Sequence, residues 1–268
     1  MATALQQLAS TAPLLLFGLL ALGVWRRLAP ERDRATLGTA RDRATLAWGL
    51  TAANFLIVGT YATAHSVFSA VAITLGRGSW AWDVISHWAG AANAGRGAAA
   101  VAYSTMLLGL MALDRRAGLR IMAVAWQVLL AVTVAGTLLG RALIPFDNAR
   151  ANYTVLAVLC AATAICLMAA LVAAVLNDGL DQLLWLAVTV YALKESVMPS
   201  LLAIMAWWAV APQAGAMRIA LWMGIILGGA MVALGVRRMQ LAAGGRPVPG
   251  VFEWLDSLRR PAPTERPL

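Results

Sequence analysis

Long apolar runs separated by short polar stretches dominate the pattern along this chain. A membrane core about 30 Å thick needs roughly 20 apolar residues per crossing helix. Seven runs reach or approach that length, and they cover Ala12–Leu28, Ala47–Leu75, Ala98–Leu113, Ile121–Gly140, Asn152–Leu176, Leu183–Val210 and Ile219–Val236. The pattern predicts an all-α fold: a polytopic membrane bundle of seven transmembrane helices over residues 1–236, followed by an Arg- and Pro-rich cytoplasmic tail over residues 237–268.

Composition supports a membrane protein and excludes several other classes. Hydrophobic residues make up 61% of the 268 positions and charged residues 12%, whereas soluble domains are about 45–50% apolar. The stretches between the runs are too short to hold a core of their own. Although the net charge is +9, no nucleic-acid-binding motif accompanies it, so we expect the lipid bilayer rather than a nucleic acid as the partner.

The arginines are distributed unequally between the two sides of the predicted bundle. Fifteen fall on the side that holds the C-terminus, namely Arg26, Arg27, Arg32, Arg34, Arg41, Arg43, Arg115, Arg116, Arg120, Arg237, Arg238, Arg246, Arg259, Arg260 and Arg266. Five fall on the other side, namely Arg77, Arg96, Arg141, Arg150 and Arg218. Because basic residues concentrate in cytoplasmic loops, the N-terminus is predicted outside and the C-terminus in the cytoplasm. The near absence of lysine is typical of a GC-rich genome, and we expect a multi-pass protein of a bacterial inner membrane.

The candidate site lies within the sixth predicted span. Lys194, the single lysine of the chain, and Glu195 are adjacent there, and ionisable groups inside a membrane usually face a cavity or a partner. Consecutive helical residues diverge by about 100°, so we expect these two to bond different partners, with Tyr191 on the face of Glu195. Pro199 removes one helical hydrogen bond and predicts a kink beside Glu195.

The second predicted span carries a polar stripe. Its members, spaced by three, seven, four and four residues, are Thr51, Asn54, Tyr61, His65 and Ser69. Such a stripe in an apolar helix indicates a protein interior or a file of water. His65 is predicted roughly 10 Å nearer the outer surface than Lys194, which disfavours direct contact and favours a relay through Tyr61, Tyr191 and water.

Three further features concern packing and loops. Gly224 with Gly228, and Gly136 with Gly140, form small-residue pairs that favour close contact with neighbouring helices or with other membrane subunits. The stretch 76–97 is predicted to be an outer loop with a short interfacial helix, on which Asp83 and His87 would pair. The hexapeptide RDRATL occurs twice, at 32–37 and 41–46, and is interpreted as a local duplication in a solvated loop.

Two functions fit these features. The first is a permease or channel-like protein, in which Lys194, Glu195, Tyr191 and the helical stripe form a polar pathway for protons, small ions or a small polar solute. The second is a non-catalytic accessory or assembly subunit of a larger membrane complex, in which the same charges satisfy buried groups of a partner. A membrane enzyme ranks third, since no nucleophile motif, phosphate loop or histidine cluster is present, and we expect no cofactor and no metal.

Overall fold

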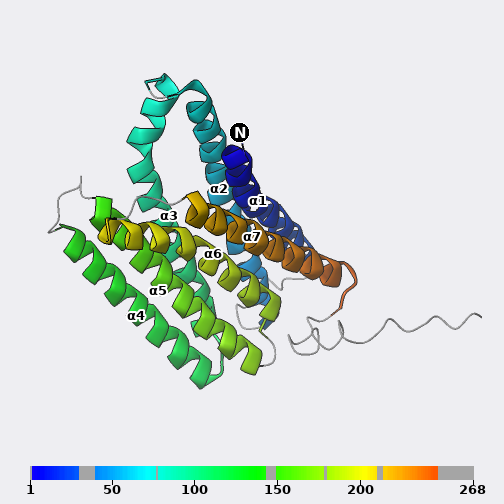
Figure 1. Cartoon of the computed structure of the whole chain (residues 1–268). Helices are drawn as coiled ribbons and strands as arrows, with labels where there is room; N and C mark the ends of the chain where they lie inside the picture. The colour runs from blue at the N-terminus through cyan, green and yellow to red at the C-terminus, as the bar shows by residue number, and fades with distance from the viewer. Residues whose placement is uncertain are drawn as a thin grey trace, which may run out of the picture.

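The computed structural model describes residues 2–29, 40–76, 78–142, 149–177, 180–209 and 214–246, apart from some side chains, including those of residues 85–96. Within these ranges the chain is helical and holds no strand. The helices are α1 (Ala2–Leu28), α2 (Ala40–Leu75), α3 (Trp80–Ala112), α4 (Ala117–Ala142), α5 (Ala149–Leu176), α6 (Gln182–Trp207) and α7 (Ala214–Ala243) (Figure 1).

Six of these helices are long and apolar enough to cross a membrane: α1, α2, α4, α5, α6 and α7. They fit a multi-pass membrane protein. Helix α3 contains a shorter apolar segment, Gly97–Ala112, which corresponds to the third predicted span. A seventh crossing and the orientation of the termini therefore stay predictions.

Several helix ends differ from the sequence prediction. The stretch expected as an outer loop is mostly helix, because α3 begins at Trp80, directly after Ser79, whose hydroxyl accepts a hydrogen bond from the Trp82 amide at 3.3 Å. This N-cap satisfies a backbone donor that a helix start would otherwise leave unpaired. Asp83 lies in the first turn of α3, whereas the side chain of His87 is outside the described part, so their pairing stays a prediction.

The ends of α2 and α7 also differ from expectation. Helix α2 begins at Ala40, so the second RDRATL copy is helical, while the first copy and residues 247–268 lie outside the described residues. Helix α7 continues to Ala243, so Arg237 and Arg238, assigned to the tail from sequence, belong to a helix. Apolar runs locate a span but not its ends, because a helix continues through polar residues beyond the bilayer core.

The helices form a ring around a common core. Contacts around the ring run from α1 to α2, α2 to α3, α3 to α5, α5 to α6, α6 to α7, and α7 back to α1. Helix α4 contacts α3 and α5 from outside this ring and lies at the edge of the molecule (Figure 1). Only 11% of the apolar stretch of α4 is buried inside the protein, against 50% of that of α6. Helix α6 is thus a central element, and α4 is the most exposed of the six long apolar helices.

The closest helix contact is between α1 and α2. A Cβ atom on Gly59 would lie 2.5 Å from the Leu15 amide nitrogen, and one on Gly18 would lie 2.8 Å from the Leu56 nitrogen. Both distances are to backbone atoms, which cannot rotate away as a side chain can. These two glycines let the helix backbones touch, as small residues commonly do between membrane helices.

Candidate functional site

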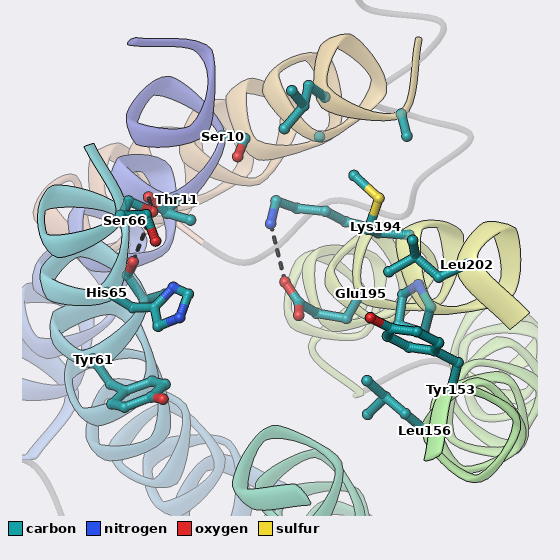
Figure 2. Close-up of a pocket in the computed structure, with 17 residues that line it drawn as sticks. Ser10, Thr11, Tyr61, His65, Ser66, Tyr153, Leu156, Lys194, Glu195 and Leu202 are labelled. Atoms are coloured by element: carbon teal, nitrogen blue, oxygen red, sulfur yellow. Dashed lines mark hydrogen bonds and ion pairs between the residues drawn. The ribbon is translucent and has the colours of Figure 1, made fainter. Parts of the chain in front are cut away.

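The centre of the site is an ion pair within α6. The Nζ atom of Lys194 lies 3.0 Å from Oε1 of Glu195, and the two side chains are 6% and 7% exposed. The expectation that these neighbours bond different partners is therefore wrong. Their Cα–Cβ bonds diverge, but both side chains are long enough to bend toward each other (Figure 2). The contact brings opposite charges together, as buried charges require.

The pair faces a cavity of about 210 Å³. Five helices contribute to its lining, and in Figure 2 Lys194 and Glu195 reach from α6 toward His65 and Ser66 on α2. The polar lining residues are Ser10 and Thr11 from α1, Tyr61, His65, Ser66 and Ser69 from α2, Tyr153 from α5, and Lys194 and Glu195 from α6. Hydroxyl, imidazole, ammonium and carboxylate groups therefore surround one space.

Two contacts between helices shape the wall of this cavity. Thr11 and Ser66 form a hydrogen bond of 3.1 Å between α1 and α2. On α7, a Cβ atom at Gly224 would lie 3.3 Å from the Ser10 Cβ and 3.9 Å from the Lys194 Cε. The missing side chain at Gly224 therefore leaves room for α1 and for the lysine.

The packing of the two glycine pairs differs. A Cβ atom at Gly228 would meet Pro13 of α1 at 2.9 Å, so Gly224 and Gly228 pack inside the chain. Of the two contacts predicted for this pair, with neighbouring helices or with other subunits, the structure shows the first. In contrast, a Cβ atom at Gly136 or Gly140 would meet no atom within 4 Å, so the α4 pair lies on an open surface.

The predicted stripe on α2 is divided between two regions. Tyr61, His65 and Ser69 line the cavity, and the rings of Tyr61 and His65 have centroids 6.2 Å apart. Thr51 lies further along the helix, where its hydroxyl is 2.8 Å from that of Tyr103 on α3. Asn54 is not a lining residue, and its buried Nδ2 atom has no hydrogen-bond partner among the described residues.

Aromatic side chains fill the bundle next to the cavity. The Phe55 ring packs edge-on against Tyr191 at 4.6 Å, Phe17 at 4.9 Å and Tyr103 at 5.8 Å, measured between centroids. Trp48 continues this cluster, with its centroid 6.3 Å from that of Phe17. Phe17, Phe55 and Tyr191 lie about one to two turns from the lining residues of their own helices, and Trp48 lies further along α2. We call the five side chains the aromatic layer; they come from α1, α2, α3 and α6 and occupy the interior of the ring.

Tyr191 and Pro199 were also predicted to take part in the site. Tyr191 is 2% exposed and belongs to the aromatic layer rather than to the cavity lining. Pro199 lines the cavity, and α6 continues through it to Trp207. The kink at Pro199 and the relay through Tyr191 stay predictions.

Beyond the aromatic layer, one carboxylate joins three helices. Asp181 precedes α6, and its Oδ2 atom accepts hydrogen bonds from the Trp48 indole at 2.7 Å and from Nε of Arg238 at 2.8 Å. Its Oδ1 atom accepts from the Leu184 amide at 3.2 Å and so caps α6. Sequence reasoning missed this group, although an Asp directly before an apolar run is a helix-start signal.

Comparison of the chain with known protein families, with curated proteins and with solved structures found no match. Among the described residues, no group of three or more His, Cys, Asp or Glu side chains is placed to hold a metal ion. The cavity and its ion pair are therefore the features from which a function can be inferred.

Proposed function

We propose that this protein is a permease or channel-like protein for protons, small ions or a small polar solute, and that Lys194 and Glu195 lie on its pathway. The observation that carries the proposal is a buried ion pair that faces a cavity between five helices, whose lining includes hydroxyl and imidazole groups. Ionisable groups so placed usually belong to ion pathways or proton relays.

The dimensions of the cavity favour a small cargo. Pockets for drug-sized ligands are about 300–1,000 Å³, whereas this cavity is about 210 Å³. It has room for a few waters, an ion or a small solute. The hydroxyl and charged groups around it offer both donors and acceptors, which suits a hydrated or zwitterionic cargo better than an apolar one.

The aromatic layer favours alternating access over an open pore. It lies between the cavity and the group around Asp181, so a cargo leaving toward that end needs the rings to part. In the proposed cycle, Glu195 gains and loses a proton or exchanges Lys194 for the cargo, while α6 rocks about Pro199. With the orientation expected from the arginines, the cavity faces the outside of a bacterial inner membrane.

A flux measurement with three variants tests this proposal. Purified protein in liposomes is assayed for the flux of protons, alkali cations and small polar solutes, using Glu195→Gln, Lys194→Met and the double variant. Each single variant leaves one charge without its partner, which costs about 3 kcal/mol of stability. The double variant removes both charges and is expected to recover much of that stability.

The double variant distinguishes a role of the ion pair in transport from a role in helix packing. If the pair acts in transport, flux stays lost in the double variant although its thermal stability returns. If the pair only fixes helix packing, stability and flux return together, which rejects the proposed role. Absence of every flux from wild-type liposomes rejects the permease assignment itself.

A second function, that of an accessory subunit, is favoured by the exposed face of α4. Gly136 and Gly140 face open space on this helix, and large apolar side chains such as Val132 and Leu139 are 63% and 67% exposed. Extraction in a mild detergent, followed by mass measurement, distinguishes the two proposals. Stoichiometric partners that Gly136→Leu releases support the subunit role, and a partner-free protein with flux supports the permease.

A further inference from the structure

A second hollow lies between α4 and α5 and shares no lining residue with the Lys194 cavity. This groove has a volume of about 420 Å³. The two helices run side by side there at the outer edge of the molecule (Figure 1). The groove starts at Arg116, directly before α4, and continues along the last turns of α5 to Asn177.

The walls of the groove are apolar. Leu119 and Ala173, at 4% and 5% exposure, are buried lining residues, while Val172 and Leu176, at 58% and 77%, are exposed side chains along it. Gly118 also lines it, and a Cβ atom there would meet nothing within 4 Å. Since α4 and α5 are both candidate membrane spans, we expect this apolar groove to lie on a surface that contacts lipid.

A basic cluster marks one end of this groove. The segment from Asp114 to Arg120 contains three arginines and one aspartate, so it is net positive. Asp114 accepts from Nε of Arg116 at 2.9 Å and from Nη2 of Arg43 at 3.0 Å. The backbone amide of Arg116 also donates to Asp114, at 2.9 Å. These bonds hold the guanidinium group of Arg116, whose side chain is 38% exposed, at the groove.

We propose that this groove binds an anionic phospholipid, with its phosphate at Arg116 and an acyl chain along α4 and α5. Nε and Nη2 of Arg116 both donate to Asp114, at 2.9 and 3.1 Å, so the net positive charge of the basic cluster, rather than an unused donor, would attract the phosphate. Arg116 directly precedes the span Ala117–Gly140, which is the depth of the headgroups. Basic pockets between membrane helices are typical sites for anionic headgroups.

The test is a competition between two lipids. The full chain is purified in detergent, stripped of lipid and offered equal amounts of phosphatidylglycerol and phosphatidylcholine, and the first bound lipid is identified by native mass spectrometry. Wild-type protein is expected to prefer phosphatidylglycerol about fivefold, the effect of one basic side chain near an anionic surface. Arg116→Gln is expected to abolish the preference.

Matched variants make the result decisive. Arg115→Gln and Arg120→Gln remove the same charge from exposed residues that do not line the groove, and both are expected to keep the preference. Gly118→Leu fills the groove without changing the charge and is expected to reduce binding of both lipids. If Arg116 bound only a soluble anion, with no acyl chain in the groove, this substitution would have no such effect. The proposal is overturned if Arg120→Gln loses the preference as fully as Arg116→Gln, or if Gly118→Leu binds lipid like the wild type.

Discussion

At the scale of single residues, three groups of buried charges among the described residues lie beside partners of opposite sign. Lys194 pairs with Glu195, Arg238 with Asp181, and Asp114 with Arg43 and Arg116. The sequence identified Lys194 and Glu195 as candidates, because charge inside an apolar run is conspicuous, but it did not predict that they pair with each other. Asp114 and Asp181 lie between runs, where a carboxylate is ordinary, so their burial follows only from the packing of helices distant in sequence.

The Asp114 cluster predicts a stability that depends on pH. Hydrogen bonding to Arg116 is the largest cause that lowers the pKa of Asp114, from its usual 3.8 to about 2. Because the pKa of Asp114 is lower in the folded state than in the unfolded state, the cluster makes its full contribution to the stability of the fold above pH 4. This contribution disappears as the pH falls toward 2. Asp114→Asn should cost about 2 kcal/mol at neutral pH, the value of hydrogen bonds to charged groups.

Thermal unfolding in detergent at pH 7, 5 and 3 checks this prediction. The difference between wild type and Asp114→Asn is expected to be equal at pH 7 and 5 and smaller at pH 3. A difference that stays constant down to pH 3 would show that the carboxylate has its ordinary pKa in both states.

At the scale of helices, apolar runs identified the spans but not how they pack. The six long apolar helices match predicted runs, since about 20 apolar residues in succession have few alternatives to a membrane helix. The first half of α3 was predicted only as a loop with a short interfacial helix, because its Ala, Gly and polar residues form no apolar run, although Ser79 is an N-cap signal. Gly18 and Gly59 were missed because a lone glycine does not reveal which helix it touches.

The close contact of α1 and α2 predicts that a glycine-to-alanine substitution has different effects on stability in α2 and in α4. Gly59→Ala places a methyl group 2.5 Å from a backbone nitrogen, and it should cost about 1–3 kcal/mol, the range for overpacking. Gly136→Ala on α4 meets no neighbouring atom within 4 Å and should be neutral or slightly stabilising, because alanine favours helix. Thermal unfolding of both variants is the measurement, and equal loss at both positions would contradict the close approach.

At the scale of the whole molecule, the site depends on how the ring closes. Lys194, Glu195, Tyr61 and His65 were identified as candidates from sequence, and they line one cavity in the structure. Ser10, Thr11, Ser66 and Tyr153 were not identified, because ordinary hydroxyl residues become lining residues only when α1, α2 and α5 meet around α6. The sequence could nominate charged residues, but it could not predict their surroundings.

We expect the Lys194–Glu195 pair to face water inside the protein, in a cavity that is reached from one side of the membrane. Cysteine labelling tests it in a chain whose two buried native cysteines are replaced by alanine. Met198→Cys places a thiol in the cavity lining, and Leu193→Cys places one on the same helix outside the cavity, at a 37% exposed position. A thiol in apolar surroundings does not ionise readily and reacts poorly.

We predict that a membrane-impermeant thiol reagent labels Met198→Cys when added from one side only, and leaves Leu193→Cys unlabelled from both sides. Labelling of neither position, or equal labelling of both, would contradict this prediction, because the ion pair would then not face an aqueous cavity inside the protein.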